Sequence, residues 1–150
     1  MGRSMITKSG NDRIYTPLEL ARAIVERYKP NGRILEPCSG NGSFLEAMPA
    51  ALSCEIDLGT DFMDWNEKVD WIVTNPPYSR YLEFLRHSFE LANNVVFLQF
   101  VNAFFMRKRV STMVEAGFEI RDIWYIPTPP KPWPQTGFQV GTIYWARKNS

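Results

Sequence analysis

Cysteine and histidine are scarce in this sequence: its 150 residues include two cysteines, Cys38 and Cys54, and a single histidine, His87. Two thiols cannot make a disulfide framework, and with one imidazole they do not make a zinc site. The apolar runs are far shorter than a membrane span, and the N-terminus lacks the apolar core of a signal peptide. We therefore expect an intracellular, cytoplasmic protein without a metal or a membrane partner.

Net charge is also nearly absent, at +1, and gives no indication of a partner. Basic residues cluster at Arg107-Lys108-Arg109 and Arg147-Lys148, but solvated helix and tail charges explain them better than a nucleic-acid surface. The length and the 45% apolar content fit one domain with its own core. We expect residues 1–12 to form a flexible tail and residues 13–150 to form that domain.

Predicted strands and helices alternate along the chain, which favours an α/β doubly wound domain with a mostly parallel sheet. Thr16 and Pro17 predict a helix start, with Thr16 as the N-cap. The last predicted strand would be antiparallel and linked to its predecessor by a hairpin. We expect helices over residues 17–28, 43–48, 81–92 and 104–116, and strands over 33–36, 52–56, 69–74, 95–101, 118–126 and 138–146. We expect His87 to pack against a helix or lie at the surface, and Trp65, Trp71, Trp124 and Trp145 to lie in the core.

One stretch, Val69-Asp70-Trp71-Ile72-Val73-Thr74-Asn75-Pro76-Pro77-Tyr78, starts apolar and β-branched and ends at two prolines. This pattern predicts a buried strand that stops in a rigid turn, because proline cannot continue a sheet ladder. The Asn75 amide oxygen, a backbone carbonyl and the Tyr78 ring would together suit a planar ring with an exocyclic amino group. A proline-terminated strand with a capping asparagine is the alternative, and these residues alone do not decide.

A glycine-containing loop follows the first predicted strand, Arg33-Ile34-Leu35-Glu36, and precedes a short helix. Such a strand, loop and helix are typical of nucleotide-binding βα units, in which Gly40 and Gly42 would let the backbone approach a ligand. The third glycine of the dinucleotide fingerprint is missing, and Glu36 would repel a pyrophosphate but suit an ammonium group. The loop therefore favours a ligand with a positively charged amino-acid head over NAD or ATP.

Acidic residues accompany the next predicted strand. Glu55 and Asp57 stand near its C-terminal end, where a carboxylate commonly accepts from two ribose hydroxyls, although a solvated strand end explains them equally well. Only Leu58-Gly59-Thr60 separates this segment from Asp61-Phe62, so no crossover helix fits between them.

In their order along the chain, these segments resemble the S-adenosylmethionine-dependent amino-methyltransferases of the DNA adenine type, whose fourth strand ends in Asn-Pro-Pro-Tyr. The resemblance extends from about Ile14 to Ala146 and follows the motif order of that family's gamma arrangement. It implies a Rossmann-like class I methyltransferase fold, S-adenosylmethionine as the cofactor and adenine in DNA as the substrate.

The resemblance also assigns roles in cofactor binding. Tyr15-Thr16-Pro17 would lie along the methionine part, and Glu36 with its loop would hold the methionyl amino group. Glu55 would bind the ribose hydroxyls, Asp61 would accept from the adenine amino group, and Phe62 would pack on the adenine ring. The implied cofactor-binding residues are Tyr15, Thr16, Pro17, Glu36, Pro37, Cys38, Ser39, Gly40, Gly42, Phe44, Glu55, Ile56, Asp57, Asp61, Phe62 and Asn75.

Residues 75–78, Asn75-Pro76-Pro77-Tyr78, match the family's catalytic motif. The resemblance implies that the Asn75 oxygen and the Pro76 carbonyl each accept one amino hydrogen of adenine, which frees the nitrogen lone pair for attack. Positioning of this kind requires no cysteine nucleophile and no tuned histidine. The base would be flipped onto Tyr78, and Trp133 or Phe138 could cover its other face, although core packing explains those two aromatics equally well.

The chain departs from the family because no stretch long enough for a target-recognition region follows the last predicted strand. Three interpretations stay open: adenine methylation with weak sequence preference, specificity supplied by a partner or a second copy, or a substrate other than duplex DNA. Structured RNA and a protein glutamine amide are such substrates. A catalytically idle cofactor-binding subunit is a further alternative, against which the intact Asn75 and Tyr78 count. The compact form would suit a phage or restriction-modification enzyme.

Overall fold

The structure is a computed structural model that describes residues 15–37, 42–54, 61–127, 131 and 139–149. Its strands are β1 (Ile34–Glu36), β2 (Leu52–Ser53), β3 (Trp71–Thr74), β4 (Asn94–Phe100), β5 (Phe118–Tyr125) and β6 (Val140–Arg147). Its helices are α2 (Leu18–Tyr28), α3 (Ser43–Ala47), α4 (Tyr81–Leu91) and α5 (Arg107–Ala116), with short 3₁₀ turns η2 (Phe62–Asp64), η3 (Tyr78–Arg80) and η4 (Val101–Phe104). None of these helices is long and apolar enough to cross a membrane.

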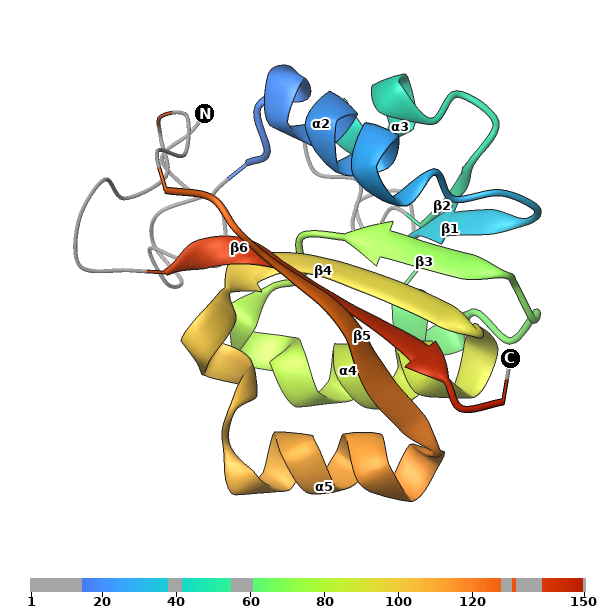
Figure 1. The fold of residues 1–150 in the computed structure, drawn as a ribbon. Coiled ribbons are helices and arrows are strands. Elements are labelled where there is room, and N and C mark those ends of the chain that lie inside the picture. The colour runs from blue at the N-terminus through green and yellow to red at the C-terminus, as the bar shows by residue number, and fades with distance from the viewer. Residues whose placement is uncertain (1–14, 38–41, 55–60, 128–130, 132–138, 150) are drawn as a thin grey trace.

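The six strands form one sheet in the order β2-β1-β3-β4-β6-β5, with α2 and α3 on one face and α4 and α5 on the other (Figure 1). β1, β2, β3 and β4 pair in parallel, whereas β6 is antiparallel to both β4 and β5. The doubly wound α/β fold and the antiparallel final strand are therefore confirmed. Because parallel strands end at the same edge, the segments that follow β1, β2, β3 and β4 gather there.

Each face of the sheet carries its own hydrophobic cluster, and the strands supply both by alternation. In β4, Val95 and Phe97 belong to the cluster under α4 and α5, while Val96 and Leu98 belong to the cluster under α2 and α3. Trp145 of β6 is fully buried, with its ring edge-on to those of Phe89, Phe97 and Phe104. Trp71 is buried as predicted, whereas Trp65 and Trp124 are only half-buried at the cluster margins.

The predicted helix over residues 104–116 is wrong at its start. The chain completes η4, leaves helical geometry at Phe105 and Met106, and enters α5 only at Arg107. Phe104 is fully buried, while Phe105 and Met106 are exposed. In the sequence, the apolar residues of η4 and α5 together have the spacing of a single amphipathic helix, although they belong to two elements.

The predicted N-cap of α2 is also wrong. Pro17, not Thr16, occupies the cap position, and its carbonyl accepts from the N–H groups of Leu20 and Ala21. The Thr16 side chain does not cap the helix and can therefore form a contact outside it. β2 is shorter than the predicted strand over 52–56, of which residues 55 and 56 lie outside the described chain.

A polar cluster fastens α2 to the antiparallel strands. Arg27 Nε donates to Asp122 Oδ2 over 2.9 Å, and the Tyr28 hydroxyl donates to the same oxygen over 2.8 Å. The Tyr28 oxygen also lies 2.6 Å from Thr142 Oγ1. The bond from Arg27 holds the pKa of Asp122 below its ordinary value against the opposing effect of desolvation, and the Tyr28 bond lowers it further.

We expect Asp122→Asn to lower the free energy of unfolding by about 1 kcal/mol at about pH 7. The folded-state pKa of Asp122 lies below the unfolded value of roughly 3.9, so its contribution is complete above that value and disappears as the pH falls through the folded-state pKa. The difference between variant and parent in urea melts should therefore shrink below about pH 4. Glu115→Gln, on the exposed face of α5, is the control and should change neither quantity; a pH-independent difference would contradict the assignment.

Candidate active site

The two proline carbonyls in the turn after β3 differ in their bonds to the described residues. β3 is buried along its whole length, and Pro76 directly beyond it is buried too. The Pro77 carbonyl accepts from the Arg80 N–H over 3.1 Å as η3 begins. Among the described residues, no donor is bonded to the Pro76 carbonyl. The turn therefore presents the Pro76 oxygen, and not the Pro77 oxygen, as an available acceptor.

Asn75 is held by the segment that precedes α2. Its Nδ2 donates to Thr16 Oγ1 over 3.3 Å, and Thr16 is buried. The Thr16 carbonyl in turn accepts from Ser43 Oγ over 2.5 Å, at the first residue of α3. Three segments that the sequence assigned to one site thus meet at Thr16, between its half-buried neighbours Tyr15 and Pro17.

The end of the glycine loop has the backbone geometry that a close ligand would need. Gly42 has φ +85°, and a Cβ built there would meet no atom within 4 Å. Glu36, at the end of β1, is 1% exposed, and Pro37 is buried after it. Phe44 is also buried, in the cluster under α2, so its side chain packs in the core, and its role in cofactor binding stays a prediction. Cys38, Ser39 and Gly40 lie outside the described residues.

Two of the predicted acids surround one thiol at the end of β2. Burial first, then the charges of Glu36 and Asp61, raise the pKa of Cys54 to about 11. The Cys54 N–H also bonds to the Glu36 carbonyl over 3.3 Å. The structure therefore brings Glu36 and Asp61 to the same edge of the sheet and keeps the thiol between β2 and η2 protonated. Glu55, Ile56 and Asp57 lie outside the described residues.

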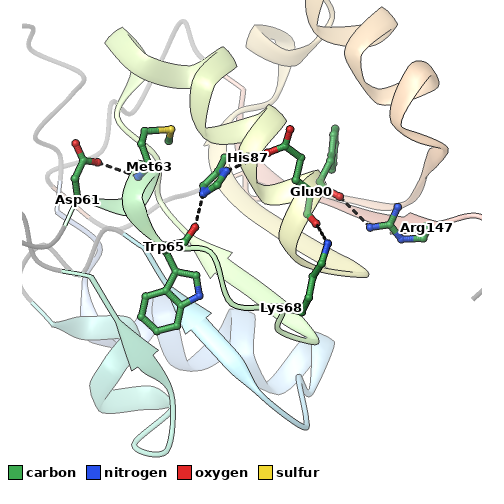
Figure 2. A network of polar contacts seen from close by, with 8 residues as sticks. Asp61, Met63, Trp65, Lys68, His87, Glu90 and Arg147 are labelled. Carbon is green, nitrogen blue, oxygen red and sulfur yellow. Dashed lines mark hydrogen bonds and ion pairs between the residues drawn. The ribbon is translucent and has the colours of Figure 1, made fainter.

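The η2 segment that carries Asp61 is fastened to α4 (Figure 2). Asp61 Oδ1 accepts from the Met63 N–H over 3.1 Å and lies 3.6 Å from Arg80 Nη2. His87 Nε2 lies 2.8 Å from the Trp65 carbonyl oxygen, which contains no hydrogen, so that ring nitrogen is the donor. This bond and the Asp61 contacts fix both ends of η2.

Phe62 lies inside η2 and is 2% exposed. Its ring centroid is 4.9 Å from that of Phe84 and 4.7 Å from that of His87. The predicted contact of Phe62 with a cofactor ring thus meets a side chain that is already packed into the core. The His87 ring packs against Phe62 of the 3₁₀ turn η2, in agreement with the prediction of a helix-packing residue. No pattern in the sequence indicated its bond to Trp65.

Tyr78 is more enclosed than the sequence suggested. Its hydroxyl accepts from the Phe100 N–H over 2.5 Å, and its ring is stacked on Phe100 at 5.3 Å and parallel to Tyr81 at 6.3 Å. Burial raises the pKa of Tyr78, so its hydroxyl stays protonated. Trp133 and Phe138, predicted as the second wall of a base site, lie outside the described residues. In the part of the chain that is described, no group of three or more His, Cys, Asp or Glu side chains could hold a metal ion.

The comparisons with known proteins identify the fold. PH1948 of Pyrococcus horikoshii, a candidate RNA methyltransferase, superposes with a TM-score of 0.68 at 16% identity over 91% of this chain and 87% of its own. The ribosomal protein L11 methylase of Lactobacillus delbrueckii subsp. bulgaricus gives 0.61 at 15% identity, over 88% and 79%. TYW2 of M. jannaschii, solved in complex with AdoMet, gives 0.55 at 16% identity, over 84% and 76%.

This chain therefore has the Rossmann-like class I methyltransferase fold. No protein-family model matches the sequence, and no curated protein matches it either. At these identities the similarity concerns the fold alone, and the chemistry has to be argued from the residues at the edge of the sheet.

The position of Cys54 allows a direct test of that edge. In a Cys38→Ser background, we expect iodoacetamide to modify native Cys54 at least about 100-fold more slowly than the unfolded chain at about pH 8.5, because the residue is buried and its pKa is about 11. Asp61→Asn keeps a capping oxygen but removes the charge, so it should lower the thiol pKa and speed the reaction several-fold.

Asp64→Asn, a neighbouring exposed carboxylate, should leave the alkylation rate unchanged. Equal rates for the native and unfolded chains would mean that Cys54 is not enclosed between β2 and η2.

Proposed function

We propose that this protein transfers the methyl group of S-adenosylmethionine to the exocyclic amino nitrogen of adenine in DNA, with weak or partner-supplied sequence specificity. The observation that carries the proposal is the turn after β3. There the Pro76 carbonyl, which accepts no hydrogen bond from the described residues, stands next to the Thr16-bound Asn75 amide. Both lie at the edge of the sheet where ligands of doubly wound folds bind.

The chemistry requires two acceptors for one amino group. The nitrogen of an aromatic amine is a poor nucleophile, because its lone pair is delocalised into the ring. Asn75 Oδ1 and the Pro76 carbonyl would each accept one hydrogen, favour tetrahedral nitrogen and release the lone pair. The Thr16 contact at Nδ2 supports this role, since it orients the other end of the amide as the acceptor.

The cofactor supplies an electrophilic sulfonium methyl group when it is bound. Glu36 would hold its ammonium group, the Gly42 backbone would allow close approach, and Asp61 would accept from its adenine amino group. Buried Glu36, open space at Gly42 and the shared influence of Glu36 and Asp61 on Cys54 support this arrangement. Glu55 would bind the ribose hydroxyls.

The target base would lie against Tyr78, which is only partly exposed, with Trp133 or Phe138 on its other face. The bond from the β4 backbone to the Tyr78 hydroxyl fixes the ring and supports this role. A base inside a duplex cannot reach such a turn, so it would have to be unpaired or flipped out. RNA adenine is the second candidate, which the fold similarity to a candidate RNA methyltransferase favours.

The decisive experiment measures transfer of a radiolabelled methyl group from S-adenosylmethionine to mixed-sequence DNA, to RNA and to whole-protein lysate in parallel. We expect label in adenine of DNA. Asn75→Ala should lower kcat at least about 100-fold, since it removes one of two preorganised acceptors, while calorimetry still detects cofactor binding.

Asn66→Ala, at an exposed asparagine before β3, is the matched control and should methylate as the parent does. Full activity of Asn75→Ala would eliminate the proposed mechanism. Label only in RNA, or only in protein glutamine, would show that the substrate is RNA or protein and not DNA. Cofactor binding without any labelled product would favour the idle-subunit alternative.

A further inference from the structure

Phe105 and Met106 are exposed apolar side chains followed directly by two exposed cations, Arg107 and Lys108; we name these four residues the 105–108 segment. Phe105 is 52% and Met106 53% exposed, which is unusual for large apolar residues in a domain whose other phenylalanines, where described, are buried. Contiguous exposed apolar side chains can form part of an interaction site, because contact with a ligand would remove them from water.

The two cations of the segment are uncompensated. Neither the Arg107 nor the Lys108 side chain forms an ion pair or hydrogen bond with the described part of the chain, and the first turn of α5 contains no acidic residue. Arg109 differs: its guanidinium lies 4.2 Å from the Tyr81 ring centroid and donates to the Ala103 carbonyl. The prediction that the basic run is only solvated therefore fails for Arg109, which is structural, and leaves Arg107 and Lys108 available to an anion.

Contacts on both sides tie the segment to the catalytic turn. Before it, the Phe100 N–H bonds to the Tyr78 hydroxyl, and the two rings stack. After it, Arg109 lies over Tyr81, the first residue of α4. In Figure 1, η4 and the start of α5 lie beyond the edge of the sheet at which β3 and β4 end. The 105–108 segment is thus held in a fixed position relative to Asn75 and Pro76.

We propose that the 105–108 segment binds single-stranded DNA next to the target adenine, with an unpaired base on Phe105 and neighbouring phosphates on Arg107 and Lys108. An aromatic ring binds any unstacked base by its flat face, and a cation binds any phosphate, so neither contact depends on sequence. A strand whose target base is already unpaired could reach the Asn75–Pro76 turn without the cost of flipping. This inference deepens the proposed function and rests on it.

Binding is tested without methyl transfer, by anisotropy of a fluorescein-labelled, mixed-sequence DNA strand of about 16 nucleotides at several salt concentrations. For Arg107→Gln with Lys108→Gln, the slope of log affinity against log salt should fall by about 1.4 in magnitude, since about 0.7 is lost per phosphate contact. Phe105→Ala should weaken binding about tenfold without changing that slope, and Phe105→Tyr should restore it.

Two matched controls use exposed residues away from the segment. Arg22→Gln with Arg86→Gln removes the same charge from α2 and α4, and Val114→Ala removes an exposed apolar side chain from the far end of α5. Both should bind the strand as the parent does. Equal losses in the controls would show a diffuse charge effect and overturn the inference.

The DNA duplex and an RNA strand of the same sequence are run beside the single strand. Tighter binding of the duplex, or binding of RNA alone, would overturn the inference. If the protein binds S-adenosylmethionine but no DNA, the inference about the 105–108 segment is overturned. Methyl transfer would then still be proposed, but to a substrate other than DNA. DNA binding that depends on the segment, in a protein that binds no S-adenosylmethionine, would instead overturn the proposed function.

Discussion

The parallel pairing of β3 with β4 is the constraint on which the candidate site depends. Both strands are buried on both faces, so their register is set by two hydrophobic clusters at once and cannot slip. β4 continues past the residue paired with Thr74 as far as Phe100. That extension gives the turn after β3 a wall to pack on, because Tyr78 stacks on the Phe100 ring and bonds to its backbone.

The fold was largely predictable, since its signals are local. Buried strands such as Trp71–Thr74 are short β-branched runs, and Gly117, with φ +80°, ends α5 where the pattern stops. The break at Phe105 and Met106 was not predictable, because periodicity cannot separate a buried 3₁₀ residue from the first turn of the next helix. Thr16 was misassigned for a related reason: Pro17 can itself occupy the N-cap position, and only the tertiary position of Asn75 shows where the Thr16 hydroxyl goes.

The candidate site, like the fold, was predictable from the sequence only in part. The resemblance, rather than any single pattern, implied that Thr16, Glu36, Asp61 and Asn75 belong to one site. The described contacts join Asn75 to Thr16 and place Glu36 and Asp61 near Cys54. The sequence could not predict which proline carbonyl accepts the backbone hydrogen bond that starts η3. It also could not show that the Phe44 ring of α3 packs in the core, because the residue type alone does not say which neighbours a side chain contacts.

The enclosure of Tyr78 is compatible with the role proposed for its ring. A free tyrosine rotates about two side-chain bonds and loses that freedom when it stacks on a ligand. Here the side-chain entropy is already lost on folding. The Phe100 N–H fixes the position of the Tyr78 hydroxyl, and the parallel rings of Phe100 and Tyr81 fix the plane of the Tyr78 ring. Burial raises the pKa of the phenol, so the hydroxyl stays neutral. A ring held in this way can position a base without moving, as catalysis by orientation rather than by a reactive side chain requires.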